Sequence, residues 1–177
     1  MATRRRGLVC SVVVGLAALL VPAVGTPVSA SAASQVDRAA LVQQWFDARN
    51  RGDVEGVFAL QTENAVWIAG PTCLAQSPCL ADGIRAVAET NAATHARFSL
   101  NNLQVAGSIV TARYELRSDT NCNAGVERVV GTVLLNIPQD KIALYVGVND
   151  VTDAQTATNL AVTAGRQPPG PRPAGCN

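Results

Sequence analysis

The chain has 177 residues, of which 48% are hydrophobic, and 14 basic residues against 13 acidic ones give a formal charge of +1. Three of the basic residues, Arg4–Arg6, lie in a predicted signal segment, which leaves 11 basic against 13 acidic residues in the rest. This balance argues against nucleic acids and anionic membranes as partners, because both require a basic face. About 145 residues remain after the signal, the size of one domain.

Residues 1–32 have the pattern of a secretory signal peptide. Arg4–Arg6 form a basic start, residues 8–21 are uncharged and mostly apolar, and Ala30-Ser31-Ala32 fits the cleavage rule. The apolar run is too short to cross a bilayer comfortably, so we expect no membrane association after cleavage. The sequence therefore predicts a secreted, extracellular protein.

Four cysteines follow the signal, and an even number in an oxidising compartment predicts two disulfides. We expect Cys73 and Cys79 to pair locally and Cys122 to tie Cys176 of the tail to the domain. A zinc site is the rival interpretation, but His95 is the only histidine and the spacing fits no zinc pattern. We therefore expect no metal, and without a phosphate-binding glycine motif we expect no cofactor.

The first half of the chain predicts three helices. Hydrophobic residues recur at helical spacing over residues 34–49, over a short segment after Asp53, and over residues 82–94. Gly52 suits the left-handed residue that ends the first helix, and Asp53 suits the N-cap of the second. A strand is expected at 65–69, followed by a loop that holds the first cysteine pair.

The second half predicts an antiparallel meander of four strands, at about 97–105, 108–117, 126–137 and 141–148. A last helix is expected at about 153–164. The domain therefore covers residues 33–165, and residues 166–177 form a Pro- and Gly-rich tail. The predicted fold is α+β: a cone-shaped, curved antiparallel sheet with three helices of the N-terminal half on its concave face.

Both faces of the third strand of this meander are apolar, so both are expected to be covered. We assign one set to the cavity under the helices and the other to the outer face. The inward set comprises Arg128, Val130, Thr132 and Leu134, and the outward set Val129, Val133 and Leu135. The outward set predicts a homodimer formed through the outer face of the sheet.

Four short segments in this order resemble the nuclear transport factor 2-like superfamily, which includes SnoaL-like polyketide cyclases, ketosteroid isomerases and limonene epoxide hydrolases. They are WFDARNRGD at 45–53, VFAL at 57–60, ENAVW at 63–67 and GIRAV at 83–87. The order of elements fits from about residue 36 to residue 153. The resemblance implies a cone-shaped pocket between the helices and the concave sheet, often apolar with a few polar groups.

The residues that the resemblance would make catalytic are missing. The isomerase-like members have a tyrosine where this chain has Trp45, an aspartate base where it has Ala69, and a proton-donating aspartate near Thr132. An indole, a methyl group and a hydroxyl cannot shuttle protons near neutral pH. The hydrolase-like members need two aspartates bridged by an arginine, and no such trio can be assigned here.

The predicted ligand-binding residues are Trp45, Trp67, Tyr114, Arg128 and Thr132. No catalytic residue is assigned, although Glu115 is the leading carboxylate if the protein turns over a substrate. Charges that alternate along the strand with Glu115 are also explained by solvent exposure, and a surface role fits His95 better than catalysis.

Three functions remain open. The first is an exported protein that binds a small apolar molecule in the cone. The second is a SnoaL-like cyclase, isomerase or epoxide hydrolase acting on an apolar substrate. The third is a structural module that dimerises through its sheet, which a cone filled by side chains would favour.

Overall fold

The computed structural model describes the backbone of residues 30–176 and the side chains from residue 38 onward. The predicted signal peptide lies outside the described residues apart from its last three positions, where the first helix begins. Secretion therefore stays a prediction. Among the described helices, none is both long and apolar enough to span a bilayer.

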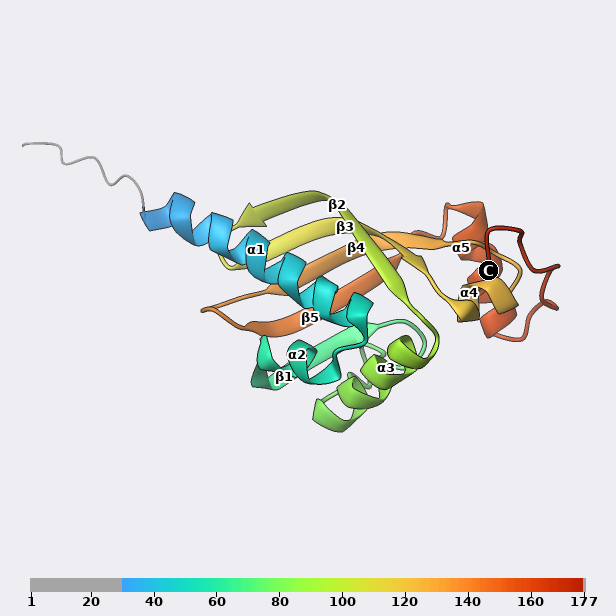
Figure 1. The fold of residues 1–177 in the computed structure, drawn as a ribbon, viewed down its shortest axis with the longest axis horizontal. Helices are drawn as coiled ribbons and strands as arrows, with labels where there is room; N and C mark the ends of the chain where they lie inside the picture. The colour runs from blue at the N-terminus through green and yellow to red at the C-terminus, as the bar shows by residue number, and fades with distance from the viewer. Residues whose placement is uncertain (1–29, 177) are drawn as a thin grey trace, which may run out of the picture.

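The fold is a five-stranded curved sheet with helices packed on one face, which confirms the predicted α+β class (Figure 1). The strands are β1 (Gln61–Ala69), β2 (Arg97–Ala106), β3 (Ile109–Arg117), β4 (Val129–Asn136) and β5 (Ile142–Asn149). Their order is β1-β5-β4-β3-β2, and β2 to β5 form the predicted antiparallel meander. One pairing differs from the prediction, because β1 runs parallel to β5.

Helices α1 (Ala30–Arg51), α2 (Val54–Ala59) and α3 (Ala81–Ala93) come from the N-terminal half, as predicted, and cover this one face (Figure 1). The turn after α1 fixes their arrangement. Gly52 adopts a φ of 70°, and the Asp53 side chain accepts a hydrogen bond from the Gly56 amide at 2.8 Å, so the two predicted cap residues act as expected. Asn50 bonds both backbone groups of Phe98, at 2.6 and 2.8 Å, which fixes the end of α1 to β2.

The face assignment of β4 is wrong. Val129, Val133 and Leu135 are buried under the helices, with Val133 and Leu135 fully inaccessible. The alternate set faces away from the helices, where Thr132 is exposed. The physical reason is that the set with Val133 is entirely apolar or glycine, whereas the set with Thr132 also contains Arg128, a charge that is costly to bury.

The loop after β1 folds back on β1, the edge strand of the sheet. Trp67 exchanges two backbone hydrogen bonds with Cys79, and Ala69 does so with Cys73. The predicted Cys73–Cys79 disulfide closes this loop. The loop thus occupies backbone groups that an open edge would leave free to pair with another chain.

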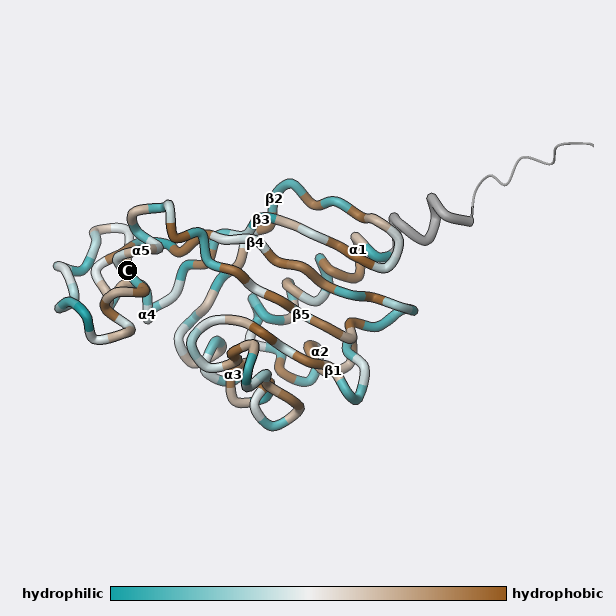
Figure 2. Tube along the Cα trace, turned by 180° about the vertical axis from the view of Figure 1, so that it is seen from behind, coloured by the Kyte–Doolittle hydropathy of each residue, from teal (hydrophilic) through white to brown (hydrophobic). Residues whose placement is uncertain are grey.

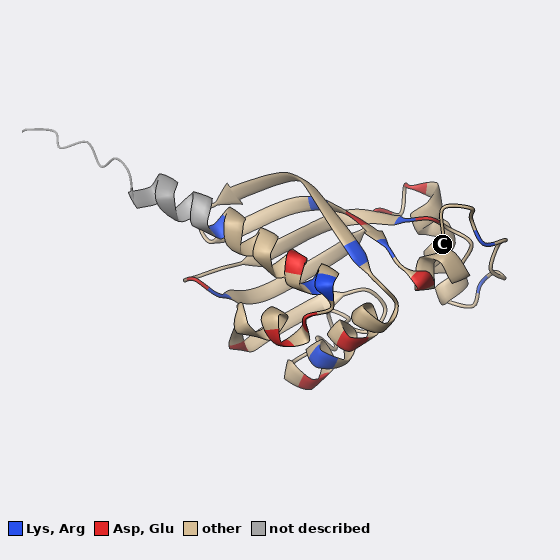
Figure 3. Cartoon of the chain, in the orientation of Figure 1, with Lys and Arg blue, Asp and Glu red and all other residues tan. Residues whose placement is uncertain are grey.

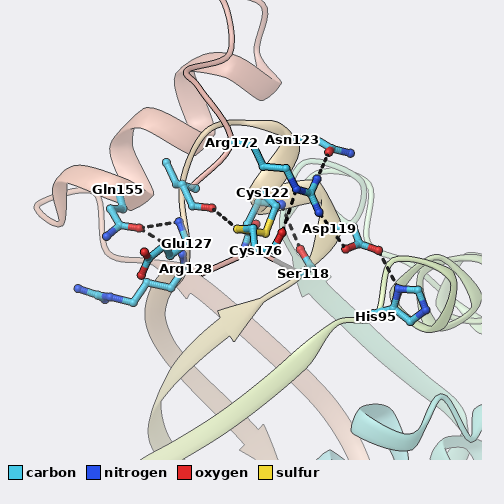
Figure 4. Close-up of a disulfide and its surroundings, with 12 residues drawn as sticks. His95, Ser118, Asp119, Cys122, Asn123, Glu127, Arg128, Gln155, Arg172 and Cys176 are labelled. Carbon is cyan, nitrogen blue, oxygen red and sulfur yellow. Dashed lines mark hydrogen bonds and ion pairs between the residues drawn. A yellow bond between two sulfur atoms is a disulfide. The ribbon is translucent and has the colours of Figure 1, made fainter. Parts of the chain in front are cut away.

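The C-terminal tail is held by the second predicted disulfide, Cys122–Cys176, which joins it to the short helix α4 (Asp119–Asn123) (Figure 4). Arg172 of the tail donates to the side chain of Asn123 at 2.7 Å and to the Cys176 carbonyl at 3.0 Å. His95 is exposed and bonds Asp119 through Nδ1 at 2.7 Å, the surface position that the sequence favoured. The tail, although irregular, is therefore fixed to the domain.

We expect loss of the long-range disulfide to destabilise the protein more than loss of the local one. In the chain-entropy account, a disulfide that spans 54 residues raises the free energy of unfolding by about 4 kcal/mol, and one that spans 6 residues raises it by about 2 kcal/mol. Denaturant unfolding of the two double Cys→Ser variants measures the difference. A larger loss for the Cys73/Cys79 variant would contradict this ranking.

Homodimer formation stays a prediction, and the corrected face moves it to the side of the sheet away from the helices (Figure 2). Val148 on β5 is 61% exposed, so Val148→Asp should turn a dimer into a monomer in light scattering at about 50 μM with little loss of stability. Val133→Asp should instead unfold the domain, because it buries a carboxylate. A monomeric wild-type protein would contradict the prediction.

Candidate ligand-binding cavity

A cavity of about 320 Å³ lies between the helices and the concave face of the sheet. Five groups of residues line it. Arg49 comes from α1; Ala69, Gly70, Pro71 and Thr72 from the end of β1; Ala86, Val87, Thr90, Asn91 and Thr94 from α3 and its C-cap; and Phe98, Tyr114, Leu116, Val129, Tyr145, Gly147 and Asn149 from the sheet. The segment with α4 and the last helix, α5 (Ala154–Thr163), completes the wall with Ser118, Thr120, Asn121, Asn159, Leu160 and Thr163.

Two polar groups on the floor of the cavity, one from β3 and one from β5, meet across β4. Tyr114 on β3, Gly131 on β4 and Asn149 on β5 are aligned by the register, and the Tyr114 hydroxyl donates to Asn149 Oδ1 at 2.5 Å. A Cβ at Gly131 would lie 2.7 Å from the Tyr114 ring and 2.2 Å from the Val148 carbonyl oxygen. Glycine at this position therefore allows the tyrosine to reach across β4.

Burial raises the pKa of the Tyr114 phenol, and neighbouring Tyr145 raises it further, although the charge of Arg49 lowers it. Desolvation disfavours the phenolate more than the guanidinium favours it. Tyr114 is therefore a neutral hydrogen-bonding group at physiological pH, and its proton is held by the bond to Asn149.

Arg49 is the charged residue of the cavity wall and is only 6% exposed. Its guanidinium carbon lies 4.1 Å from the ring centre of Phe98 and 4.8 to 5.3 Å from those of Trp45, Phe46, Trp67 and Tyr145. Rings at these distances stabilise a cation through their negative faces. The aromatic residues of α1, β1, β2 and β5 thus enclose the side of the guanidinium away from the solvent.

The α4–α5 segment is positioned by side-chain hydrogen bonds. The Asp153 carboxylate caps α5 by accepting from the Thr156 amide at 2.9 Å, and this bond is the main reason that the pKa of Asp153 is lowered. On the cavity side, Asn159 of α5 donates to Asn121 of α4 at 3.2 Å, and Asn121 in turn donates to the Leu116 carbonyl at 2.8 Å. These bonds link the last helix to the end of β3.

The structure brings one of the five predicted ligand-binding residues, Tyr114, into the cavity wall. Trp45 and Trp67 are fully buried in the core behind Arg49 and do not line the cavity. Arg128 and Thr132 lie on the outer face, so their expected position beside the cavity is wrong, for the reason given for β4.

Glu115, the weak catalytic candidate, also lies on the outer face, because it alternates with inward Tyr114. It bonds Arg117 at 2.8 Å and lies 3.9 Å from Arg128, in an open polar depression of the outer face. The structure therefore supports the other interpretation of these charged side chains, in which they face the solvent and pair with one another.

Sequence reasoning missed Arg49, Asn149 and the α4–α5 wall. Arg49 was visible as a basic residue four residues after Trp45, which places it on the same face of the first helix as that apolar residue. Asn149 and the α4–α5 residues gave no such signal, because their place in the wall depends on the register of β5 and on the hydrogen bond between Asn159 and Asn121.

Comparisons with known proteins agree with this architecture. The SnoaL-like domain family matches residues 42–145 of the chain. A search of curated protein sequences finds no match.

Solved structures with this fold include the epoxide hydrolase/cyclase-like enzyme SalBIII of pyran ring formation in the polyether salinomycin, with 18% identity, a TM-score of 0.57, and coverage of 68% of this chain and 95% of that one. A proposed ketosteroid isomerase from Kribbella flavida DSM 17836 has 19% identity, a TM-score of 0.52, and coverage of 66% and 80%. A computationally designed 17-OHP binder has 13% identity, a TM-score of 0.55, and coverage of 66% and 92%. These likenesses confirm the predicted nuclear transport factor 2-like fold.

Tyr114→Phe should destabilise the protein by about 1–3 kcal/mol at neutral pH, because Asn149 Oδ1 loses its donor.

The substitution should also change how the free energy of unfolding depends on pH in the alkaline range. The pKa of Tyr114 is raised in the folded state, so its contribution to stability is complete below about pH 10, the unfolded value, and falls above it by about 1.4 kcal/mol per pH unit. Denaturant unfolding between pH 8 and pH 11 should therefore show a steeper loss for the wild-type protein than for Tyr114→Phe. Parallel curves would contradict this account.

Proposed function

Because the chain belongs to the SnoaL-like domain family, we propose that it is an exported protein that binds a small, largely apolar molecule in its cone. The observation that carries the proposal is the cavity itself. It has the size of a small-molecule pocket, and its wall combines apolar side chains with neutral hydrogen-bonding groups and one arginine. A cone left open in this way supports binding over a purely structural module.

The chemistry of the wall supports binding over catalysis. Among the described residues that line the cavity, none is an aspartate, a glutamate or a histidine. Tyr114 and Tyr145 are the phenols of the wall, and the raised pKa of Tyr114 makes that residue a poor proton-transfer group near neutral pH. The same fold serves an epoxide hydrolase/cyclase-like enzyme and a designed binder, so the fold alone does not choose between the two.

Two further features support the export and the kind of partner that we propose. The chain has one disulfide within the domain and one between the domain and its tail, and such bonds are usual in oxidising compartments outside the cytosol. Basic and acidic positions are interspersed over the described chain, which supports a small molecule rather than a nucleic acid as the partner (Figure 3).

A bulky side chain at the cavity wall should block binding. Ala86 and Ala81 are both exposed on α3, but Ala86 lines the cavity and Ala81 does not. With a panel of steroids and polycyclic aromatic compounds, we expect at least one compound to raise the Tm of the wild-type protein. Ala86→Trp should weaken its binding about tenfold or more, and Ala81→Trp should leave it unchanged.

Thermal shift and tryptophan fluorescence measure both effects. A panel without any bound compound would overturn the proposal. Equal affinity of the wild-type protein and Ala86→Trp would show that the compounds bind elsewhere on the molecule.

A further inference from the structure

Arg49 carries a buried charge without a counterion. In the part of the chain that the structure describes, no carboxylate lies within ion-pair distance of its guanidinium, and no hydrogen-bond acceptor contacts it. Other arginines of the described chain, such as Arg113 and Arg128, pair with aspartates at the surface. A buried charge is costly unless it is paired, so the surroundings of Arg49 need an explanation.

The aromatic rings explain how the charge is tolerated, but not how its donors are satisfied. The ring faces attract a cation, yet they offer no strong acceptor to the five N–H groups of a guanidinium. Nε and Nη1 of Arg49 are enclosed without a partner, and so is Nε1 of Trp45, one helical turn earlier on α1. Every one of these three atoms is a donor, so what the site lacks is an acceptor.

The free direction of the guanidinium is the cavity. Arg49 belongs to the cavity wall, and Nη2 is not among its enclosed, unpartnered nitrogens. The other described residues of the wall are uncharged, so no protein carboxylate competes for this position. An acceptor supplied by a ligand would meet a cation in a site with little water, where a charge-assisted hydrogen bond is strong.

We infer that the cavity takes an amphipathic organic acid, whose carboxylate pairs with Arg49 at the inner end while its apolar body fills the cone. The inference rests on the proposed small-molecule binding and names the ligand class. The apolar part of the wall, with Val87, Leu116 and Leu160, fits the body of such a molecule. Neutral polar groups such as Asn91 and Tyr114 are available to its remaining polar atoms.

Two probes that share one ring system and differ in their polar group test this inference. 2-Naphthoate and 2-naphthalenemethanol share one ring system, and the second lacks the carboxylate. Isothermal titration calorimetry should show that the wild-type protein binds the acid about tenfold or more tightly than the alcohol. Arg49→Gln should remove this preference, so that its affinities for the acid and the alcohol agree within about twofold. Arg51→Gln is the matched control, because Arg51 is exposed on the same helix and its loss changes the net charge equally.

Each outcome decides the matter. If the alcohol binds as tightly as the acid, or if folded Arg49→Gln keeps the preference, the inference fails while the proposed function stands. If neither compound binds, the inference fails, and the panel of steroids and polycyclic aromatic compounds decides the proposed function separately. If Arg49→Gln does not fold, Arg49→Lys replaces it: a lysine lacks the planar fork, so the ratio of the affinity for the acid to that for the alcohol should fall several-fold. An unchanged ratio in Arg49→Lys would overturn the inference.

Discussion

The aromatic cluster around Arg49 connects the layers of this fold. Trp45 and Phe46 come from α1, Trp67 from β1 and Tyr145 from β5, and neighbouring ring centres lie 4.9 to 5.3 Å apart. Most of these contacts are edge-to-face, the arrangement that pairs the positive edge of one ring with the negative face of the next. One helix and the parallel pair of strands are thereby held together at a single place.

This cluster also explains why an unpaired guanidinium survives in the interior. The ring faces replace part of the hydration that Arg49 loses, but they leave its N–H donors without acceptors. A buried cation needs stabilisation of its charge and acceptors for its hydrogen-bond donors. In this fold the aromatic core stabilises the charge, and an acceptor can be supplied from the cavity side. A site of this kind favours a ligand that brings its own acceptor over one that brings another donor.

Local sequence signals predicted the framework well. The Asn-x-Gly-Asp turn, the apolar spacing of the helices and the strand lengths are short-range features, and the cysteine pairs followed from their positions in a loop and in the tail. The parallel pairing of β1 with β5 was not predictable in the same way. It joins segments about 80 residues apart, and no local residue preference specifies such a partner.

The cavity was harder to predict than the framework, and β4 shows why. Two interleaved sets of apolar residues fit either face, and the expectation that polar Arg128 and Thr132 serve a ligand placed the wrong set inside. The presence of charge in one set was in fact the better guide to the solvent side. The same rule identifies Arg49 as unusual, because it is a charged residue on the buried face of α1. Such a position requires an interaction that stabilises the charge.

The most direct test of this account is a crystal structure of the protein with 2-naphthoate bound. We predict that the naphthalene ring lies in the cone and that a carboxylate oxygen lies within about 3 Å of the Arg49 guanidinium. A complex in which the carboxylate points to solvent, with Arg49 still unpaired, would contradict the central claim.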